Sequence, residues 1–411
     1  MRRSIAAALA ALLLAGCGGG KPYNPDLDEP AGPRIVVTTN PASVTAGGQQ
    51  QFYAQVTGIV SPVVEWSVDG EEGSGTITTG GLYQAPSTPG TYTVRATVQG
   101  YPAVTATASV TVTGGGGEPV DGTIYIADMG NHRIVRIDDM SGTGWVEFGS
   151  QGSGTGQFNA PHRVFVYGGR IYVVDRNNNR IVRMDSMTGA GSVSFGSTGS
   201  GVGQFNQPYD IHVDSTGIYV VDSSNNRIVR MADMDGSGWQ TYGTTGSGVG
   251  QLRTPTAITQ SDGQLFIVDA GNNRIVKIND MSGAGHQALA SASGIAPIGF
   301  SFPTGIAVGS GGGIYICDTG NRRLVRVDNM LGSGAVAYGT EGSGVGSFFG
   351  PQCVRTPANN RIYLSDIGNH RIVRIDDMTG TGWLTYGSSG FAQGRFNAPW
   401  GLFVYFGSGR P

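Results

Sequence analysis

A short apolar run that ends in aspartate recurs six times after residue 120, and this repeat constrains the fold more than any other feature. Successive aspartates of the set are 47, 47, 47, 49 and 48 residues apart. A period in the forties, with several short apolar runs in each unit, is typical of a β-propeller whose units each form one four-stranded blade. The abundant glycines, 70 of 411 residues, follow the same period, so they indicate turns between strands and not disorder. Six copies predict six blades over residues 120–411.

The shared positions of each unit can be followed in the second copy. It contains Phe158-x-x-Pro161, then an apolar run over 171–174 that ends at Asp175, then Asn178-Asn179-Arg180-Ile181. This pattern resembles the NHL repeat, and the resemblance covers about residues 120–405. It implies a six-bladed propeller, a fold in which some relatives bind a divalent metal at the axis and others bind RNA.

The phase of the repeats predicts how the ring closes. The first copy begins at a second strand, residues 124–127, with no inner strand before it, whereas the last copy is followed by an extra apolar run over 401–404. We expect this run to complete the first blade, so that both ends of the segment share one sheet and no sheet edge stays open. The predicted fold class is therefore all-β, with a closed six-bladed propeller as its larger part.

Residues 1–16 have the pattern of an export signal. Arg2 and Arg3 precede an apolar run over 5–15, which is too short to span a bilayer comfortably. The stretch that ends at Cys17 resembles the lipobox of bacterial lipoproteins. The resemblance implies lipidation of Cys17 and anchoring to the cell envelope, in the outer membrane if the host has one, because Gly18 is not aspartate. An ordinary signal peptide with an incidental cysteine is the alternative.

Three further segments separate this signal from the repeats. Residues 17–33 are rich in glycine and proline and predict a flexible tether. Residues 34–113 alternate apolar and polar side chains between turn signals, which predicts a small sandwich of about seven strands. The run from Trp66 to Gly70, with Gly81 to Pro86, resembles bacterial immunoglobulin-like domains and implies a spacer with Trp66 in its core. Residues 114–119 form a glycine-rich linker.

A second repeated set places an arginine five residues after each aspartate. A strand-end carboxylate that faces an arginine across a tight turn can form a bidentate ion pair, and an active site is not normally repeated six times. We therefore assign this set a structural role. The pairs are Asp128 and Arg133, Asp175 and Arg180, Asp222 and Arg227, Asp269 and Arg274, Asp318 and Arg323, and Asp366 and Arg371.

Function is better sought where the copies differ. The two positions after the proline of each inner strand vary from blade to blade, and in a propeller they lie near the axis on the face of the entering loops, where ligands usually bind. Drifted loop residues without a ligand are the alternative. The candidate contact residues are His162, Arg163, Tyr209, Asp210, Gln352 and Trp400.

Charge and residue usage limit the function classes. Residues 120–411 carry 21 basic and 21 acidic side chains, which argues against nucleic acid as a partner. No general acid and base pair stands out, and the sequence assigns no catalytic residue, metal ligand or cofactor. Cys317 and Cys353 could be bonded, although two separate buried thiols fit better.

We therefore expect a non-catalytic, membrane-anchored envelope protein that binds a protein or a glycan through the propeller loop face. A metal-dependent propeller lyase or hydrolase, and a structural envelope component without a discrete ligand, are the alternatives.

Overall fold

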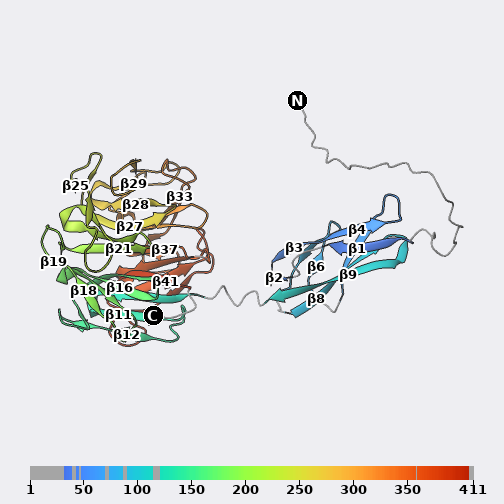
Figure 1. Ribbon diagram of the computed structural model, residues 1–411, viewed down its shortest axis with the longest axis horizontal. Coiled ribbons are helices and arrows are strands. Elements are labelled where there is room, and N and C mark those ends of the chain that lie inside the picture. The colour runs from blue at the N-terminus through green and yellow to red at the C-terminus, as the bar shows by residue number, and fades with distance from the viewer. Residues whose placement is uncertain are drawn as a thin grey trace, which may run out of the picture. The chain divides into compact units, whose positions relative to one another are not determined.

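The computed structural model describes residues 32–38, 43–45, 48–69, 74–86, 90–113, 121–357 and 359–406 (Figure 1). The chain divides into two compact units, residues 1–119 and 120–411. The predicted signal peptide, Cys17, the tether up to residue 31 and the glycine-rich linker lie outside the described residues. Within the described part of the chain, no helix has the length and apolar character needed to cross a membrane.

The first unit contains nine described strands in three small sheets. The four-stranded sheet has the order β2-β9-β8-β5, a three-stranded sheet has the order β3-β7-β6, and β1 pairs with β4. Phe52, Tyr83 and Val94 are buried between these sheets, whereas Trp66 is only partly buried and packs at the edge of the same cluster. The strands are β1 (Arg34–Thr38), β2 (Ser43–Thr45), β3 (Gln49–Gln51), β4 (Tyr53–Thr57), β5 (Val64–Asp69), β6 (Thr76–Ile77), β7 (Leu82–Gln84), β8 (Gly90–Val98) and β9 (Tyr101–Thr113).

The second unit contains six four-stranded antiparallel sheets, as the repeat predicts for six blades. The first blade is formed by β10 (Thr123–Asp128), β11 (Arg133–Ile137), β12 (Val146–Phe148) and β41 (Pro399–Tyr405), and the second by β15 (Pro161–Tyr167), β16 (Arg170–Asp175), β17 (Arg180–Met184) and β18 (Val193–Phe195). The third is formed by β21 (Pro208–Asp214), β22 (Gly217–Asp222), β23 (Arg227–Met231) and β24 (Gln240–Tyr242), and the fourth by β27 (Pro255–Ser261), β28 (Gln264–Asp269), β29 (Arg274–Ile278) and β30 (Gln287–Leu289). The fifth is formed by β31 (Gly305–Val308), β32 (Ile314–Asp318), β33 (Arg323–Val327) and β34 (Val336–Tyr338), and the sixth by β37 (Pro351–Arg355), β38 (Ile362–Asp366), β39 (Arg371–Ile375) and β40 (Leu384–Tyr386).

Short parallel strand pairs brace most loops that lead from one blade to the next. They are β13 (Ser150–Gln151) with β14 (Gln157–Phe158), β19 (Ser197–Thr198) with β20 (Gln204–Phe205), β25 (Thr244–Thr245) with β26 (Gln251–Leu252), and β35 (Thr340–Glu341) with β36 (Ser347–Phe348). A single-turn 3-10 helix joins the second and third strand of each blade: η1 (Met129–Asn131), η2 (Arg176–Asn178), η3 (Ser223–Asn225), η4 (Ala270–Asn272), η5 (Thr319–Asn321) and η6 (Ile367–Asn369).

The burial of the strands explains their sequences. Second strands such as β10 and β22 are buried on both faces, because each blade packs against the next, and they are correspondingly continuous apolar runs. Outermost strands such as β18 are largely exposed. The core of this unit therefore lies in the layers between neighbouring blades.

The two ends of the propeller segment share one blade. β41 pairs with β10 in antiparallel register, with Ile126 opposite Leu402 and Tyr125 opposite Phe403. Each inner strand contacts the next in the order β41, β15, β21, β27, β31 and β37, and β37 contacts β41 again. None of the described sheets closes on itself, so the ring is made by packing between separate sheets.

A buried ionic cluster reinforces this junction. Asp121, just before β10, accepts hydrogen bonds from Tyr363 Oη at 2.6 Å, from Arg374 Nη1 at 3.2 Å and from Arg361 Nη1 at 3.4 Å. All three donors belong to the sixth blade, and the side chain of Asp121 is only 7 % exposed. The cluster therefore fastens the first blade to the sixth through side chains as well as backbone.

Candidate functional site

The repeated aspartates stabilise the turn between the second and third strand of each blade. In the second blade, Asp175 Oδ2 accepts hydrogen bonds from Asn178 Nδ2 and Arg180 Nε, both at 2.8 Å, and Asp175 Oδ1 accepts one from the backbone N–H of Asn159 at 2.7 Å. Burial raises the pKa of Asp175 although these donors oppose the shift. The same aspartate-to-arginine contact, at 2.7–3.0 Å, occurs in all six blades.

These ion pairs differ from the bidentate pairs that we expected. Each arginine contacts its aspartate through Nε alone, and its terminal nitrogens bind carbonyl groups of the loop that enters the blade, except that Arg133 Nη1 donates to the carboxylate of Glu147. Arg180, for example, donates to the carbonyls of Ser153 at 2.7 Å and Gln157 at 2.9 Å. The arginine therefore joins the turn to the entering loop, which is a structural role.

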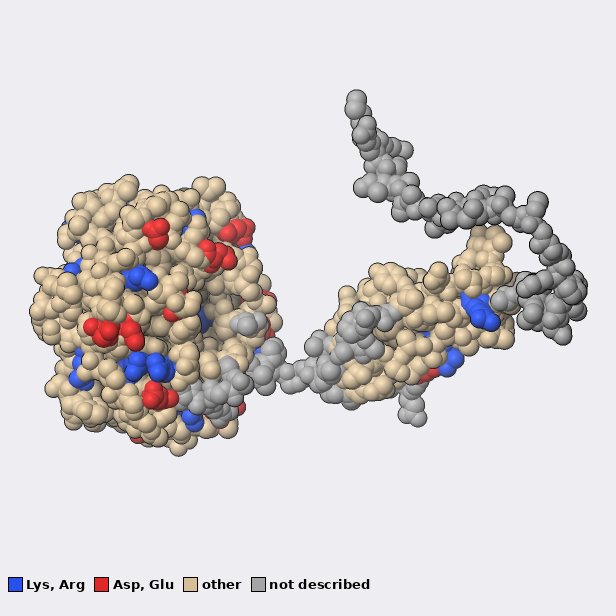
Figure 2. Space-filling model, viewed as in Figure 1, with Lys and Arg blue, Asp and Glu red and all other residues tan. Residues whose placement is uncertain are grey.

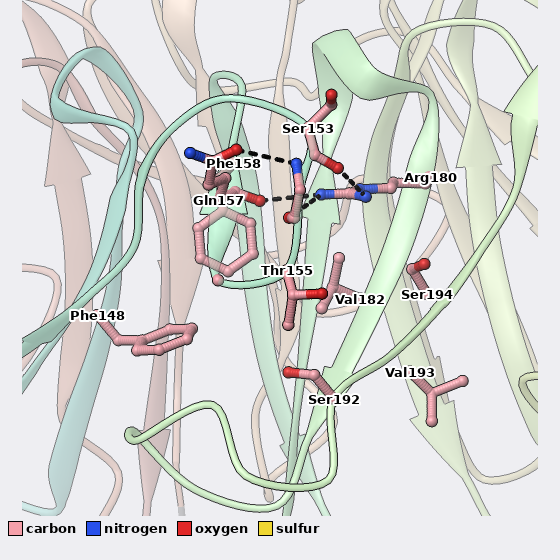
Figure 3. Close-up of a pocket in the computed structure, with 12 residues that line it drawn as sticks. Phe148, Ser153, Thr155, Gln157, Phe158, Arg180, Val182, Ser192, Val193 and Ser194 are labelled. Atoms are coloured by element: carbon pink, nitrogen blue, oxygen red, sulfur yellow. Dashed lines mark hydrogen bonds between the residues drawn. The ribbon is translucent and has the colours of Figure 1, made fainter.

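A peripheral pocket of about 220 Å³ lies over this arrangement between the first and second blades (Figure 3). Phe148, Phe158 and Arg180 line it together with the loop over residues 153–157. The polar groups at its rim already bind one another, since Gly154 N–H donates to Gln157 Oε1 at 3.0 Å and Arg180 binds loop carbonyls. The equivalent hydrogen bonds recur in the next two blades, so this pocket has no distinctive chemistry.

Three of the six candidate contact residues form an aromatic cluster at the starts of β15, β21 and β41. The ring of His162 stacks on Trp400, with centroids 4.2 Å apart and planes at 29°. Tyr209 meets His162 edge-on at 4.2 Å and Trp400 at 5.7 Å. The three rings come from blades that are neighbours in the ring and far apart in sequence. Tyr209 and Trp400 are partly exposed, while His162 is buried beneath them.

The electrostatics of this cluster favour neutral rings. Burial lowers the pKa of His162 well below its usual value, and the nearby guanidiniums of Arg176 and Arg163 lower it further. Burial also raises the pKa of Tyr209 to about 12. Arg176 lies over the Tyr209 ring, with its Cζ atom 5.4 Å from the ring centroid. The cluster therefore offers uncharged aromatic surface beside one guanidinium.

Two other candidates pair with each other inside the protein. Arg163 Nε lies 2.7 Å from Asp210 Oδ1, and Arg163 Nη1 donates to Cys353 Sγ at 2.6 Å. Asp210 also accepts hydrogen bonds from the backbone N–H groups of Ile211 and Ile258. Arg163 and Asp210 are 4 % and 2 % exposed. They are therefore interior residues and do not form part of a surface on the loop face, contrary to the expectation for contact residues.

Gln352 is the remaining candidate. It is buried at the start of β37, and its Oε1 has no hydrogen-bond partner among the described residues. Cys353, the next residue, and Cys317 are both buried free thiols, and no disulfide joins them.

Sequence analysis missed a second feature of the axis, which lies further along the inner strands. A pocket of about 180 Å³ is lined there by at least one residue from each inner strand. The lining includes Phe165, His212, Thr259, Ala307, Arg355 and Phe403. Phe165 and His212 follow the candidates Arg163 and Asp210 by two residues, so the two-residue period of a strand could have identified them as facing the same side.

Among the residues that the structure describes, no three histidine, cysteine, aspartate or glutamate side chains form a group that could hold a metal ion. Charged groups of both signs alternate over the face shown in Figure 2, without a large patch of either sign on the propeller. The fold and its axis thus define an all-β protein whose larger unit is a β-propeller.

Comparisons with known proteins support this class. Residues 157–237 match a family model described as a 6-bladed beta-propeller, and residues 300–326 match the NHL repeat. No curated protein matches the sequence.

Solved structures agree on the fold. The structure titled as a nidogen/laminin complex has a TM-score of 0.51 at 17 % identity, over 68 % of this chain and 97 % of that one. A streptogramin B lyase has a TM-score of 0.46 at 18 % identity, over 66 % of this chain and 81 % of that one. Virginiamycin B lyase from Staphylococcus aureus has a TM-score of 0.44 at 13 % identity, over 80 % and 90 % of the two chains. The first similarity supports the propeller fold alone, and the two lyases carry no argument about activity.

Proposed function

We propose that this protein is a non-catalytic envelope binding protein that captures a protein partner on the loop face of a closed propeller. The observation that carries the proposal is a set of large apolar side chains at the tips of the loops that enter the blades. Val202, Val249, Val345 and Phe391 are 77 %, 78 %, 78 % and 73 % exposed. In this proposal the four side chains contribute to one interaction surface with the loops around them, since exposed apolar surface at such a site is typical of protein interfaces.

The centre of the same face supports this proposal. Tyr209 and Trp400 present partly exposed rings beside Arg176, and tyrosine, tryptophan and arginine are the residues that most often dominate binding energy in protein interfaces. The aspartate and arginine pairs hold each entering loop in place, so the surface is organised before the partner arrives.

In this proposal the residues before the propeller attach it to the cell envelope and act as a spacer. The lipobox resemblance would attach Cys17 to the cell envelope, in the outer membrane of a host that has one. The tether and an immunoglobulin-like sandwich would hold the propeller away from the membrane surface. Both are proposals that follow from the sequence.

The test is capture of partners from envelope extracts by the native chain and two variants. Tyr209→Ala with Trp400→Ala removes the central rings, and a triple serine variant at Val202, Val249 and Val345 removes the apolar loop tips. We expect at least a tenfold loss of capture from each, with the folded state retained. Leu331→Ser is the matched control, because Leu331 is 87 % exposed and lies in a loop between the third and fourth strands of a blade, not at the tip of an entering loop.

Equal capture by both variants would contradict the choice of face. Capture that survives protease treatment of the extract and is lost after glycosidase treatment would instead identify a glycan.

A further inference from the structure

The axial pocket lies away from the loop face and has its own chemistry. All six inner strands contribute to it, and its walls are mainly apolar, with Phe165, Ala307 and Phe403 among them. Its polar lining consists of Arg355, His212, Thr259 and Thr356. No carboxylate group lines it. The pocket therefore combines apolar walls with hydrogen-bond donors, and one of these donors, Arg355, is a cation.

Arg355 has no carboxylate of its own among the described residues. Asp210, whose charge acts on Arg355, is already paired with Arg163 at 2.7 Å. Arg163 and Arg355 thus share this one carboxylate. Burial, together with repulsion by Arg163, lowers the pKa of Arg355 to about 10. Arg355 is only partly buried, so its guanidinium can pair with an anion that enters the pocket from solution.

The other charged groups near the pocket do not supply that anion. Asp214, on the same strand as His212, lies 3.5 Å from His212 Nε2 and accepts hydrogen bonds from Thr216. Its Oδ1 is therefore engaged by Thr216, and its Oδ2 faces His212 and forms no ion pair with Arg355 among the described residues. Thr356 Oγ1 is buried in the pocket wall and has no hydrogen-bond partner among the residues that the structure describes. It is a second polar group that a bound ligand could satisfy.

The aromatic walls indicate which kind of anion fits. The Arg355 Cζ atom lies 6.0 Å from the ring centroids of both Phe165 and Phe403, so the guanidinium lies close to two apolar rings. A small, strongly hydrated dianion such as phosphate would lose its water shell against these rings without a second cation to replace it. A monocarboxylate with an apolar body matches one guanidinium, nearby hydroxyl groups and apolar walls.

We propose that the axial pocket binds a small monocarboxylate whose apolar body packs against Phe165 and Phe403 and whose carboxylate pairs with Arg355. This site is independent of the proposed protein-binding face, because it is built from residues further along the inner strands. Binding there involves no covalent change.

Calorimetric titration of the full chain tests the proposal with benzoate and isovalerate as probes. We expect saturable binding of at least one of these carboxylates, at least tenfold weaker binding of the neutral benzamide, and weaker binding of inorganic phosphate. Arg355→Gln should reduce carboxylate affinity at least tenfold. Arg326→Gln is the matched control, since Arg326 is paired with Asp328 and lies outside the pocket, and it should bind as the native chain does.

Two further measurements keep the proposal falsifiable if a variant folds poorly. Crystals of the unaltered protein soaked in 4-bromobenzoate should show the bromine between Phe165 and Phe403. The Tyr209→Ala, Trp400→Ala variant should keep carboxylate binding even where it loses partner capture. Absence of binding by both carboxylates, equal binding by Arg355→Gln, preference for phosphate, or bromine elsewhere would each overturn the proposal.

Discussion

Arg163 and Asp210 form a buried ion pair across two blades, with Arg163 Nε 2.7 Å from Asp210 Oδ1. The arginine lies on β15 and the aspartate on the inner strand of the next blade, β21. Two backbone N–H groups also donate to Asp210, one of them from the fourth blade. This carboxylate therefore joins three consecutive blades at the axis.

Asp210→Asn should strongly destabilise the propeller. The substitution removes the carboxylate that pairs with Arg163, and a buried charge left without its partner costs about 3–5 kcal/mol. Urea unfolding measures the loss directly. The Arg163→Met, Asp210→Asn double variant should recover part of it, because no arginine is then left unpaired at this position. A double variant as unstable as the sum of the single variants would contradict the coupling.

The stability of the protein should fall between pH 6.5 and pH 5 in part because of His162. Burial and the nearby arginines keep this histidine neutral in the folded state, whereas the unfolded chain takes up a proton below about pH 6.5. Each pH unit below that value should cost up to about 1.4 kcal/mol from this residue.

His162→Phe should reduce this slope, since phenylalanine keeps an aromatic ring beside Trp400 and cannot be protonated. His132→Gln, which removes a histidine from the repeated turn instead, is the variant with which the pH slope of His162→Phe is compared. Free energies of unfolding at four pH values would settle the point, and parallel slopes for the native chain and His162→Phe would show that the histidine does not contribute.

Asp121→Asn should weaken the junction between the first and sixth blades. The carboxylate accepts hydrogen bonds from Tyr363, Arg361 and Arg374, and the amide keeps only part of this capacity. We expect a loss of about 2–4 kcal/mol in the free energy of unfolding. Asp280→Asn, at a surface turn, should change it by less than about 0.5 kcal/mol. A similar small effect at both positions would contradict the proposed fastening.

Truncation after Asn397 tests the closure of the ring. It removes β41 with Leu402 and Val404, leaves β10 without its inner neighbour and exposes the apolar layer that contains Ile124 and Ile126. The melting temperature should fall by on the order of 10 °C, and the exposed edge should cause association that size-exclusion chromatography detects. A chain that ends at Phe406 retains the whole strand and is the control. A monomer with an unchanged melting temperature would refute closure through β41.

The repeat period made the propeller predictable from sequence, because each apolar run that ends in aspartate becomes a second strand at the expected place. The contacts between individual side chains were harder to predict from the sequence. Asp210 follows the inner-strand proline as a contact residue would, yet it is buried, because its partner Arg163 lies 47 residues away on another blade. Sequence analysis did not predict Arg355 as a site residue for a related reason. Its importance depends on which carboxylates lie near it in space, and the sequence does not show that Asp210 is already paired.

The pairing of β10 with β41 also governs when the protein can be completed. The ribosome synthesises β10 first among the propeller strands and β41 last. The first blade therefore lacks its inner strand while the other five blades are synthesised. Contacts that span nearly 280 residues form slowly, because much chain must be ordered before the two strands meet. Until then β10 offers a bare hydrogen-bonding edge. A chaperone that shields such edges would therefore be of most use for this protein during the interval before its last strand emerges.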